Sequence, residues 1–382
     1  MGSARAFRND DVAEVTSLWV KAFCTGGCST EDSVARYLQD SLFSNPWYDE
    51  DVASLVYEEK GRIVGFLGVM ARPMTLLGRP IRAAVAAQLL VDKGQPSAFV
   101  PAALMRKLFA GPQDFTYSDG ATDLARRIFE SAGGEVASLY APQWTRVLRP
   151  AAYLADRFKS RKILAPWIGL SLPVYKAFDA VAVRIKRGPC RLQKATVADS
   201  EPCDSDTLWR LRQLIPERSL MPVYTSDSFR WLIEQASQQK LHGVLQKNVV
   251  RDPQGDVAGW FLYYVKPRGV AQVLQVFSKP RAAGQVLTSL FQHARLHGAV
   301  AVSGQGEPSM ALDLAKAHCE FTWSGGVVIH SRTPEILDAV RRGDAALTRL
   351  EGEWWTRFCD LAATKVVIRA RQRAAFPEVA AT

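Results

Sequence analysis

Two similar successions of apolar and polar residues run along this chain. Each begins with a short strand and two amphipathic helices, whose apolar residues recur every three or four positions. A hairpin, a long apolar strand, a loop with a helix, a further strand, another helix and two last strands follow. In the first succession the pattern predicts strands at 4–8, 53–58, 63–70, 81–91, 115–118, 136–140 and 145–148. In the second it predicts strands at 192–197, 242–251, 257–265, 270–277, 300–303, 321–323 and 327–330.

Matching residues support a repeat of this order. Asp32–Leu38 is similar to Asp227–Leu232 with one gap. From the first residue of each segment to the glycine of the hairpin turn, the chain advances 29 residues in the first case and 28 in the second. We therefore predict an internal duplication, with one mixed α/β domain at residues 1–150 and another at 192–332. A proline-bounded excursion is predicted at 73–80, between two strands of the first domain.

The composition is that of a protein with large cores. The chain has 382 residues, of which 48% are hydrophobic, and its length predicts two or three domains. Six scattered cysteines are typical of a reducing compartment, and neither a secretory signal nor a run long enough to span a membrane is evident. We therefore predict a cytoplasmic location. Cys24 and Cys28 have a loosely metal-like spacing, but no matching pair follows, so no metal site is predicted.

The positive charge is concentrated between the two predicted domains. Residues 146–191 hold eleven Lys and Arg against two Asp, which accounts for nearly all of the net charge of +10. The segment 151–191 is therefore predicted to be a basic amphipathic linker. One interpretation is a linker helix that packs across both domains and exposes its charged outer face to solvent. The other is docking on the anionic inner face of a membrane, or a channel for an acidic or lipid-linked acceptor. Nucleic acid is disfavoured, because no recognised binding motif accompanies the charge.

A strand, a short loop and a helix are predicted in succession over residues 270–298. The loop Ser278–Gly284 contains Pro280 and Arg281, and the helix after it ends at Gly298. This arrangement points backbone N–H groups and the positive end of a helix dipole at one place, which suits a phosphate group. The alternative is an ordinary connection between a strand and a helix.

The order of elements resembles that of the GNAT acyltransferase superfamily, and it does so twice, over residues 4–150 and 192–332. The resemblance implies two tandem GNAT-like domains that transfer an acyl group from coenzyme A to an amine, or sometimes to a hydroxyl. It also implies that the fourth strand of a domain diverges from the fifth, with the thioester in the gap. The pyrophosphate of the coenzyme would bind the loop amides of a [Gln/Arg]-x-x-Gly-x-[Gly/Ala] motif.

The second domain matches this motif better than the first. Its loop contains Arg281 and Gly284 in the expected places, whereas Val286 replaces the final small residue and is expected to crowd the phosphate. The resemblance implies that the coenzyme binds Val276, Phe277, Arg281, Ala282, Ala283, Gly284 and Gln285. In the first domain no motif residue is present between Pro96 and Pro101, and the corresponding candidates are Val91, Ser97 and Ala98.

The catalytic residues that the resemblance implies are replaced in both domains. The tyrosine of the last helix falls on Phe129 in the first domain and near Lys316 in the second. The glutamate of the fourth strand has no counterpart, since the polar residues there are Gln88, Gln272 and Gln275. The candidate bases are Asp119 and Glu307, each just after a fifth strand, with a helix cap or a solvated loop acid as the alternative. His318 is a candidate acid for the leaving thiolate, with core packing as the alternative.

The C-terminal part, 333–382, is predicted to be a helix followed by a tail. Thr333 and Pro334 are typical of a helix start. The stretch Glu351–Trp355 places acids beside two tryptophans, which suits sugar or amine binding but also suits packing between domains.

The sequence thus predicts a tandem GNAT-fold acyltransferase that uses acetyl-CoA or another acyl-CoA. The predicted acceptor is an amine, with a hydroxyl as the second choice, on a small molecule or on a sugar or lipid-linked cell-envelope precursor. One alternative is a Fem-type aminoacyltransferase that uses aminoacyl-tRNA, although no long helical-hairpin insertion of that type is evident. The other is a non-catalytic ligand-binding module with the GNAT fold.

Overall fold

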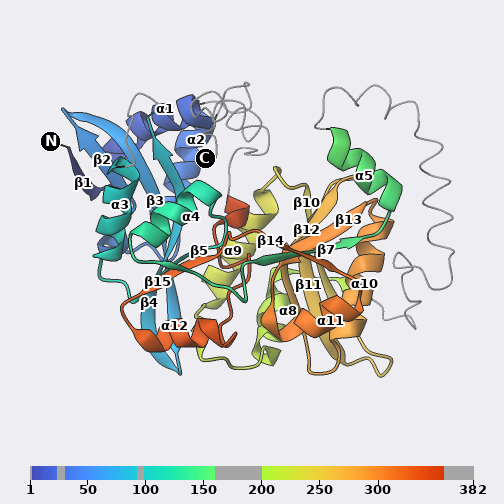
Figure 1. Ribbon diagram of the computed structural model, residues 1–382. Helices are drawn as coiled ribbons and strands as arrows, with labels where there is room; N and C mark the ends of the chain where they lie inside the picture. Colours follow the sequence, from blue (N-terminus) through green and yellow to red (C-terminus); the bar gives the residue numbers. More distant parts are fainter. Residues whose placement is uncertain (1, 24–30, 93–98, 160–199, 357–382) are drawn as a thin grey trace, which may run out of the picture.

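Two mixed sheets lie side by side, and each is covered by helices on both faces (Figure 1). The computed structural model describes residues 2–23, 31–92, 99–159 and 200–356. The α/β fold class predicted from the sequence is confirmed. The predictions at Ser97 and Ala98, in most of the basic linker and in the tail from 357 lie outside the described residues.

The first sheet is built mainly from the N-terminal half. Its strands lie in the order β1 (Ser3–Ala6), β2 (Leu55–Glu59), β3 (Arg62–Leu76), β4 (Arg79–Val91), β5 (Phe115–Ser118), β15 (Val328–Ser331) and β6 (Glu135–Val136). Apolar side chains of two helices pack on one face, from α1 (Val12–Phe23) and α2 (Glu31–Leu38). The other face packs against α3 (Phe99–Phe109) and α4 (Asp123–Ser131).

The second sheet repeats this plan. Its strands lie in the order β14 (Glu320–Trp323), β7 (Pro142–Val147), β13 (Ala301–Gln305), β12 (Val270–Ser278), β11 (Val257–Val265), β10 (Val244–Arg251) and β8 (Ser200–Pro202). One face packs against α8 (Ser205–Leu211) and α9 (Ser226–Gln238). The other face packs against α10 (Ala283–Leu296) and α11 (Ala311–Lys316).

The two sheets exchange one strand each. β7 follows β6 in the chain but pairs with β13 and β14 in the second sheet. β15 follows β14 but pairs with β5 and β6 in the first sheet. The prediction that these strands complete their own halves was wrong, because an apolar pattern identifies a strand but not the sheet edge with which it pairs. Two crossing connections therefore tie the halves together.

Two further helices follow the exchanged strands. α5 (Pro150–Lys159) comes directly after β7, and α12 (Pro334–Arg341) comes after β15. The apolar face of α12 packs into the core of the first sheet through Ile336, Ala339 and Val340. The predicted helix start at Thr333 and Pro334 is confirmed, with the proline in the first turn.

The predicted excursion at 73–80 is instead the tip of a long hairpin. β3 and β4 pair without interruption from Gly68 and Ala87 to Leu76 and Arg79. Leu77 and Gly78 form the turn with φ of 50° and 79°. Both prolines fit because the extended backbone tolerates their φ. This tip reaches the second half, where β9 (Leu220–Pro222) pairs with residues 74–76 of β3.

Candidate active site

Each sheet opens between its two central parallel strands. β4 pairs with β5 only from Ala83 to Val85, and β12 pairs with β13 only from Val270 to Gln272. Beyond these pairs the strands diverge, while β4 and β12 remain bonded to the hairpin strand on their other side. The divergence that the resemblance implies is therefore present in both halves.

A β-bulge marks the start of both openings. In β4 the bulge is at Gln88, where the register with β3 shifts and φ is 46°. In β12 it is at Leu274, where the register with β11 shifts between Leu262 and Tyr263. A bulge leaves a residue out of the ladder and bends the strand. Both halves therefore have a bulge at a matching place in the strand that borders the opening.

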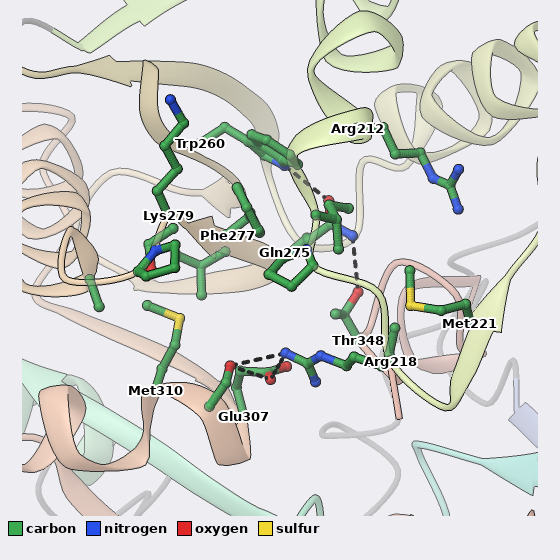
Figure 2. A pocket seen from close by; sticks show the side chains of 18 of the residues that line it. Arg212, Arg218, Met221, Trp260, Gln275, Phe277, Lys279, Glu307, Met310 and Thr348 are labelled. Carbon is green, nitrogen blue, oxygen red and sulfur yellow. Dashed lines mark hydrogen bonds and ion pairs between the residues drawn. The ribbon is translucent and has the colours of Figure 1, made fainter. Parts of the chain in front are cut away.

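The second opening leads into a cavity of about 280 Å³. Its apolar wall comes from both faces of the cleft and includes Leu208, Phe229, Trp260, Phe277 and Met310. Figure 2 shows Gln275 and Phe277 on one side, with Met310 and Glu307 opposite them. A smaller cavity is lined by residues of β12 and β13 and shares four wall residues with the first. The size and the apolar lining are typical of a small-molecule site.

The N-terminus of α10 lies at the mouth of this cavity. The N-cap residue Ala282 makes no side-chain cap, and within the described ranges no protein acceptor takes the N–H groups of Ala283, Gly284 and Gln285. No atom lies within 4 Å of a Cβ built on Gly284. Free N–H groups and open space at a helix N-terminus suit a phosphate. The expected crowding by Val286 was wrong, because its side chain is fully buried in the core.

Two cations flank the same loop. Lys279 and Arg281 line the cavity, and neither has a carboxylate within ion-pair distance among the residues that the structure describes. Arg281 has a φ of 68°, a left-handed conformation that is uncommon outside glycine. Unpaired cations beside free N–H groups give this end of the cavity a positive potential, which favours an anionic ligand.

Gln275 is the centre of a hydrogen-bond network in the cavity wall. Its Oε1 accepts a hydrogen bond from Trp260 Nε1 at 3.2 Å (Figure 2). Its Nε2 donates to Thr348 Oγ1 at 3.4 Å and to Glu351 Oε1 at 3.3 Å. The side chain is 9% exposed, so these bonds hold it in one orientation next to the bulge.

Glu307, a candidate base, lies in the cavity wall opposite. Its carboxylate forms an ion pair with Arg218 at 2.8 Å and accepts a hydrogen bond from Ser309 at 2.8 Å (Figure 2). Arg218 also donates to the carbonyl of Ala345 at 2.8 Å. The ion pair and the hydrogen bond occupy the carboxylate with two fixed donors. This geometry therefore suits orienting a ligand better than accepting a proton.

The segment 347–356, here called the strap, runs between the two halves. Eight of its ten residues are buried, and three of these, Arg349, Glu351 and Glu353, carry charges. The strap begins in the wall of the cavity with Thr348 and Glu351. Its last residues lie between the halves, at the red end of the ribbon in Figure 1.

The far end of the strap closes the opening of the first half. Asp119 Oδ1 accepts the N–H groups of Glu353 at 2.6 Å and Trp354 at 2.9 Å. On the other side of the opening, Gln88 donates to the hydroxyl of Tyr37, which in turn donates to the carbonyl of Thr356. Asp119 is thus bonded to the strap rather than facing a cavity. Burial raises its pKa to about 7, and the nearby Glu353 carboxylate adds to the rise.

The remaining candidates lie away from the cavity. His318 is exposed in the turn after α11, where its carbonyl accepts a hydrogen bond from Arg146. Phe129 is buried against Phe109 in the first core, and Lys316 is exposed at the end of α11. The sequence pattern predicts no role for Arg218, and none for the carboxyl group of Glu351 in particular. The acids beside the tryptophans were the only signal for the strap.

The two adjacent tryptophans of the strap, Trp354 and Trp355, pack against neighbouring side chains. Trp355 is 3% exposed in the core of the second half and donates from Nε1 to the carbonyl of Leu350 at 3.0 Å. Trp354 lies between the guanidinium of Arg349, 4.1 Å from the ring centroid, and His242.

Comparison with solved structures shows that the chain has the GNAT fold. A protein of unknown function from Enterococcus faecalis V583, described as a probable N-acyltransferase, has a TM-score of 0.55 at 8% identity. The match covers 87% of this chain and 73% of that one. A GCN5-related N-acetyltransferase from Anabaena variabilis has a TM-score of 0.55 at 10% identity, with 89% and 75% covered.

A third similar structure is the N-myristoyltransferase of Saccharomyces cerevisiae with bound myristoyl-CoA. Its TM-score is 0.50 at 10% identity, with 86% of this chain and 79% of that one covered. Comparison with family models and with curated proteins finds no match to the sequence. The likeness therefore establishes the fold, and the predicted resemblance to the superfamily is confirmed at that level. None of the helices within the described ranges is long and apolar enough to cross a membrane.

Proposed function

We propose that the protein is an acyltransferase that moves an acyl group from acyl-CoA to an amine, with a hydroxyl as the second choice. The cleft of the second half is the proposed site. The observation that carries the proposal is that the uncapped N-terminus of α10 lies at the mouth of a cavity between diverging strands. A coenzyme A thioester needs an anion site at one end and a narrow apolar cleft at the other, and this cleft offers both.

The residues present fit the coenzyme. Gly284 leaves room for the pyrophosphate, and Lys279 and Arg281 can neutralise its charge. The bulge at Leu274 disturbs the strand pairing where the thioester carbonyl would lie, so a backbone N–H there can polarise that carbonyl. Acetyl-CoA is the proposed donor, and a longer acyl chain would fill more of the apolar wall.

The acceptor is proposed to enter from the side of the α8–α9 connection, whose residues Arg212, Pro216 and Met221 line the cavity. A small molecule, or a sugar or lipid-linked precursor, remains the proposed class. Peripheral contact with an anionic membrane through the basic linker is a separate proposal. Flotation with anionic liposomes tests it, and a protein that stays at the bottom of the gradient contradicts it.

Substitution of Gly284 by tryptophan should weaken the binding of acetyl-CoA. The indole would occupy the open space above the helix N-terminus and block the phosphate, so we expect at least a roughly 100-fold rise in Kd. Isothermal titration calorimetry measures the binding, and release of free thiol in the presence of primary amines measures the transfer. Leu296→Trp is the matched control, because Leu296 lies at the far end of the same helix and is 84% exposed.

Two outcomes would count against this proposal. A wild-type protein that binds no acetyl-CoA at millimolar concentration contradicts the coenzyme A site. If wild type and Gly284→Trp both bind acetyl-CoA with the same Kd, the coenzyme binds elsewhere on the chain.

A further inference from the structure

We propose that Glu351, on the strap, accepts the proton of the acceptor amine during acyl transfer. The assignment rests on the proposed function and adds to it a catalytic residue. It stands on the position of the carboxyl group, on its hydrogen bonds and on the absence of an ion-pair partner among the described residues.

The position of Glu351 is at the cavity, beside the bulge. Glu351 lines the cavity, and its Oε1 accepts a hydrogen bond from Gln275, the residue that follows bulged Leu274 in β12. The part of β12 that lines the cavity, Gln275–Ser278, carries no carboxylate of its own. The strap therefore brings an acid to a strand that lacks one.

Other acids in the cavity wall are less suitable. Glu307 forms an ion pair with Arg218 and accepts a hydrogen bond from Ser309. Asp313 lies on α11, which packs on the opposite face of the sheet from α8 and α9. Of the three acids that line the cavity, Glu351 is the one that is hydrogen-bonded to Gln275, the residue after the bulge in β12.

The hydrogen bonds of Glu351 all come from neutral donors. Oε1 accepts from Tyr224 at 3.0 Å, and Oε2 accepts from the backbone N–H of Thr348 at 3.1 Å and from the Thr348 hydroxyl. Within the described part of the chain no Lys, Arg or His lies within ion-pair distance of the carboxylate. The four donors fix the carboxylate in place, and because all of them are neutral, no fixed cation offsets the charge that an incoming ammonium meets. To take a proton, the carboxylate exchanges one hydroxyl donor, that of Thr348 or Tyr224, for the new O–H bond.

The surroundings keep this group basic. Burial raises the pKa of Glu351, because a charged carboxylate is poorly solvated there. The hydrogen bonds from Thr348 and Tyr224 and the charge of Arg212 oppose this rise without cancelling it. The other ionisable groups that face it, at longer range, are Arg72 and Tyr117. Burial also holds the pKa of Tyr224 well above its usual value, so this hydroxyl stays protonated and remains a donor.

Proton transfer to Glu351 and acyl transfer to the amine need no reactant besides acyl-CoA, the acceptor and water. The ammonium of the acceptor transfers a proton to the Glu351 carboxylate, and the free amine attacks the thioester carbonyl carbon. The new C–N bond forms as the C–S bond breaks, and the electron pair of that bond leaves with the sulfur as the thiolate of coenzyme A. As the amide forms, the nitrogen loses its second proton, and this proton reaches the thiolate, directly or through water, to give free coenzyme A. Glu351 returns its own proton to solvent when the product leaves.

The test compares Glu351→Gln with Glu353→Gln in the full chain. Removal of a general base costs about 10²–10⁴-fold in rate, so we expect kcat/KM of Glu351→Gln to fall at least 100-fold, with the Kd for acetyl-CoA unchanged. The rise of kcat/KM with pH, which reports deprotonation of the base, should disappear in this variant. Glu353→Gln is the matched control, since Glu353 is a buried acid two residues along that faces Ser118 of the first half.

A restored carboxylate separates catalysis from structure. In the Glu351→Gln protein, the additional substitution Gln275→Glu places an acid on β12. The two hydrogen-bonded side chains, at 275 and 351, then exchange their amide and carboxyl groups. We expect at least a tenfold recovery of kcat/KM and of its rise with pH. A loss caused only by altered packing would not recover in this way.

The protein without any substrate gives an independent readout. Because the pKa of Glu351 is raised on folding, its contribution to stability is full at low pH and is lost as the pH rises through the folded-state pKa. Wild type should therefore lose stability relative to Glu351→Gln as the pH increases from about 4 to 8. Equal pH dependence of unfolding in the two proteins would contradict a raised pKa and with it the basicity that the assignment needs.

The outcomes distinguish the two proposals. If wild type binds acetyl-CoA and transfers acetyl, while Glu351→Gln keeps its kcat/KM and pH profile, the assignment of Glu351 is wrong and the function stands. If wild type neither binds acetyl-CoA nor releases thiol, the proposed function fails, and the base assignment is overturned with it.

Discussion

Replacement of Trp144 by alanine should lower the free energy of unfolding of the whole chain by about 3–5 kcal/mol. Trp144 lies in β7, the strand that the N-terminal half contributes to the second sheet, and it is 1% exposed. Its ring lies over Gly304 of β13, where a Cβ would approach it to 2.5 Å, and packs edge-on against Phe291 of α10. Loss of the ring leaves a cavity that a rigid sheet cannot close.

The exchanged strands determine whether the loss of stability affects both halves together. β7 carries the chain from the first sheet into the second, and β15 carries it back. Neither sheet can unfold without releasing a strand of the other, so we expect one cooperative transition in wild type and in the variant. Trp144 also lines the smaller cavity beside β12 and β13, so weaker binding of acyl-CoA should accompany the loss.

Denaturant unfolding followed by circular dichroism and by fluorescence measures this effect. Trp323→Ala is the control, because Trp323 is 61% exposed on β14, which pairs with β7, and should change stability by less than about 0.5 kcal/mol. Two separate transitions, with only one of them shifted by Trp144→Ala, would show that the exchange does not couple the halves.

The local part of the site could be predicted from the sequence. Strand, loop and helix around Gly284 are adjacent in the chain, so the apolar pattern and the turn residues suffice to place them. The motif also favoured the second half, in which the cavity lies. Only the orientation of Val286 was misjudged. Its position in the first turn of α10 directs the side chain into the core rather than toward the loop.

The long-range part could not be predicted in the same way. Which edge β7 and β15 join depends on contacts between residues far apart in the chain, and the alternation along each strand is compatible with either sheet. The strap was harder still, because Arg349, Glu351 and Glu353 give it the pattern of a solvated segment. The structure shows that Arg349 and Glu351 have partners in the second half, whereas Glu353 has a partner in the first.

The strap depends on a single glycine where it meets the first half. A Cβ at Gly352 would lie 2.2–2.3 Å from the three carboxyl atoms of Asp119, closer than any side chain tolerates. We therefore expect Gly352→Ala to cost about 2–5 kcal/mol of stability, from overpacking and from loss of the bonds that Asp119 accepts. Gly326→Ala is the matched control, because the atom nearest to its new Cβ would be the carbonyl oxygen of Ala121 at 3.5 Å.

The same substitution should also reduce acyl transfer, because Gly352 follows Glu351 directly in the strap. Thermal unfolding and thiol release, measured on Gly352→Ala and on Gly352→Ala with Asp119→Ala, separate the clash from other effects. Removal of the Asp119 carboxyl group frees the space, so Gly352→Ala should cost at least about 1 kcal/mol less in the Asp119→Ala background than in wild type. Equal costs in both backgrounds would mean that Asp119 does not hold the strap. The strap would then be held to the first half by the hydrogen bonds of Tyr37, Tyr117 and Ser118.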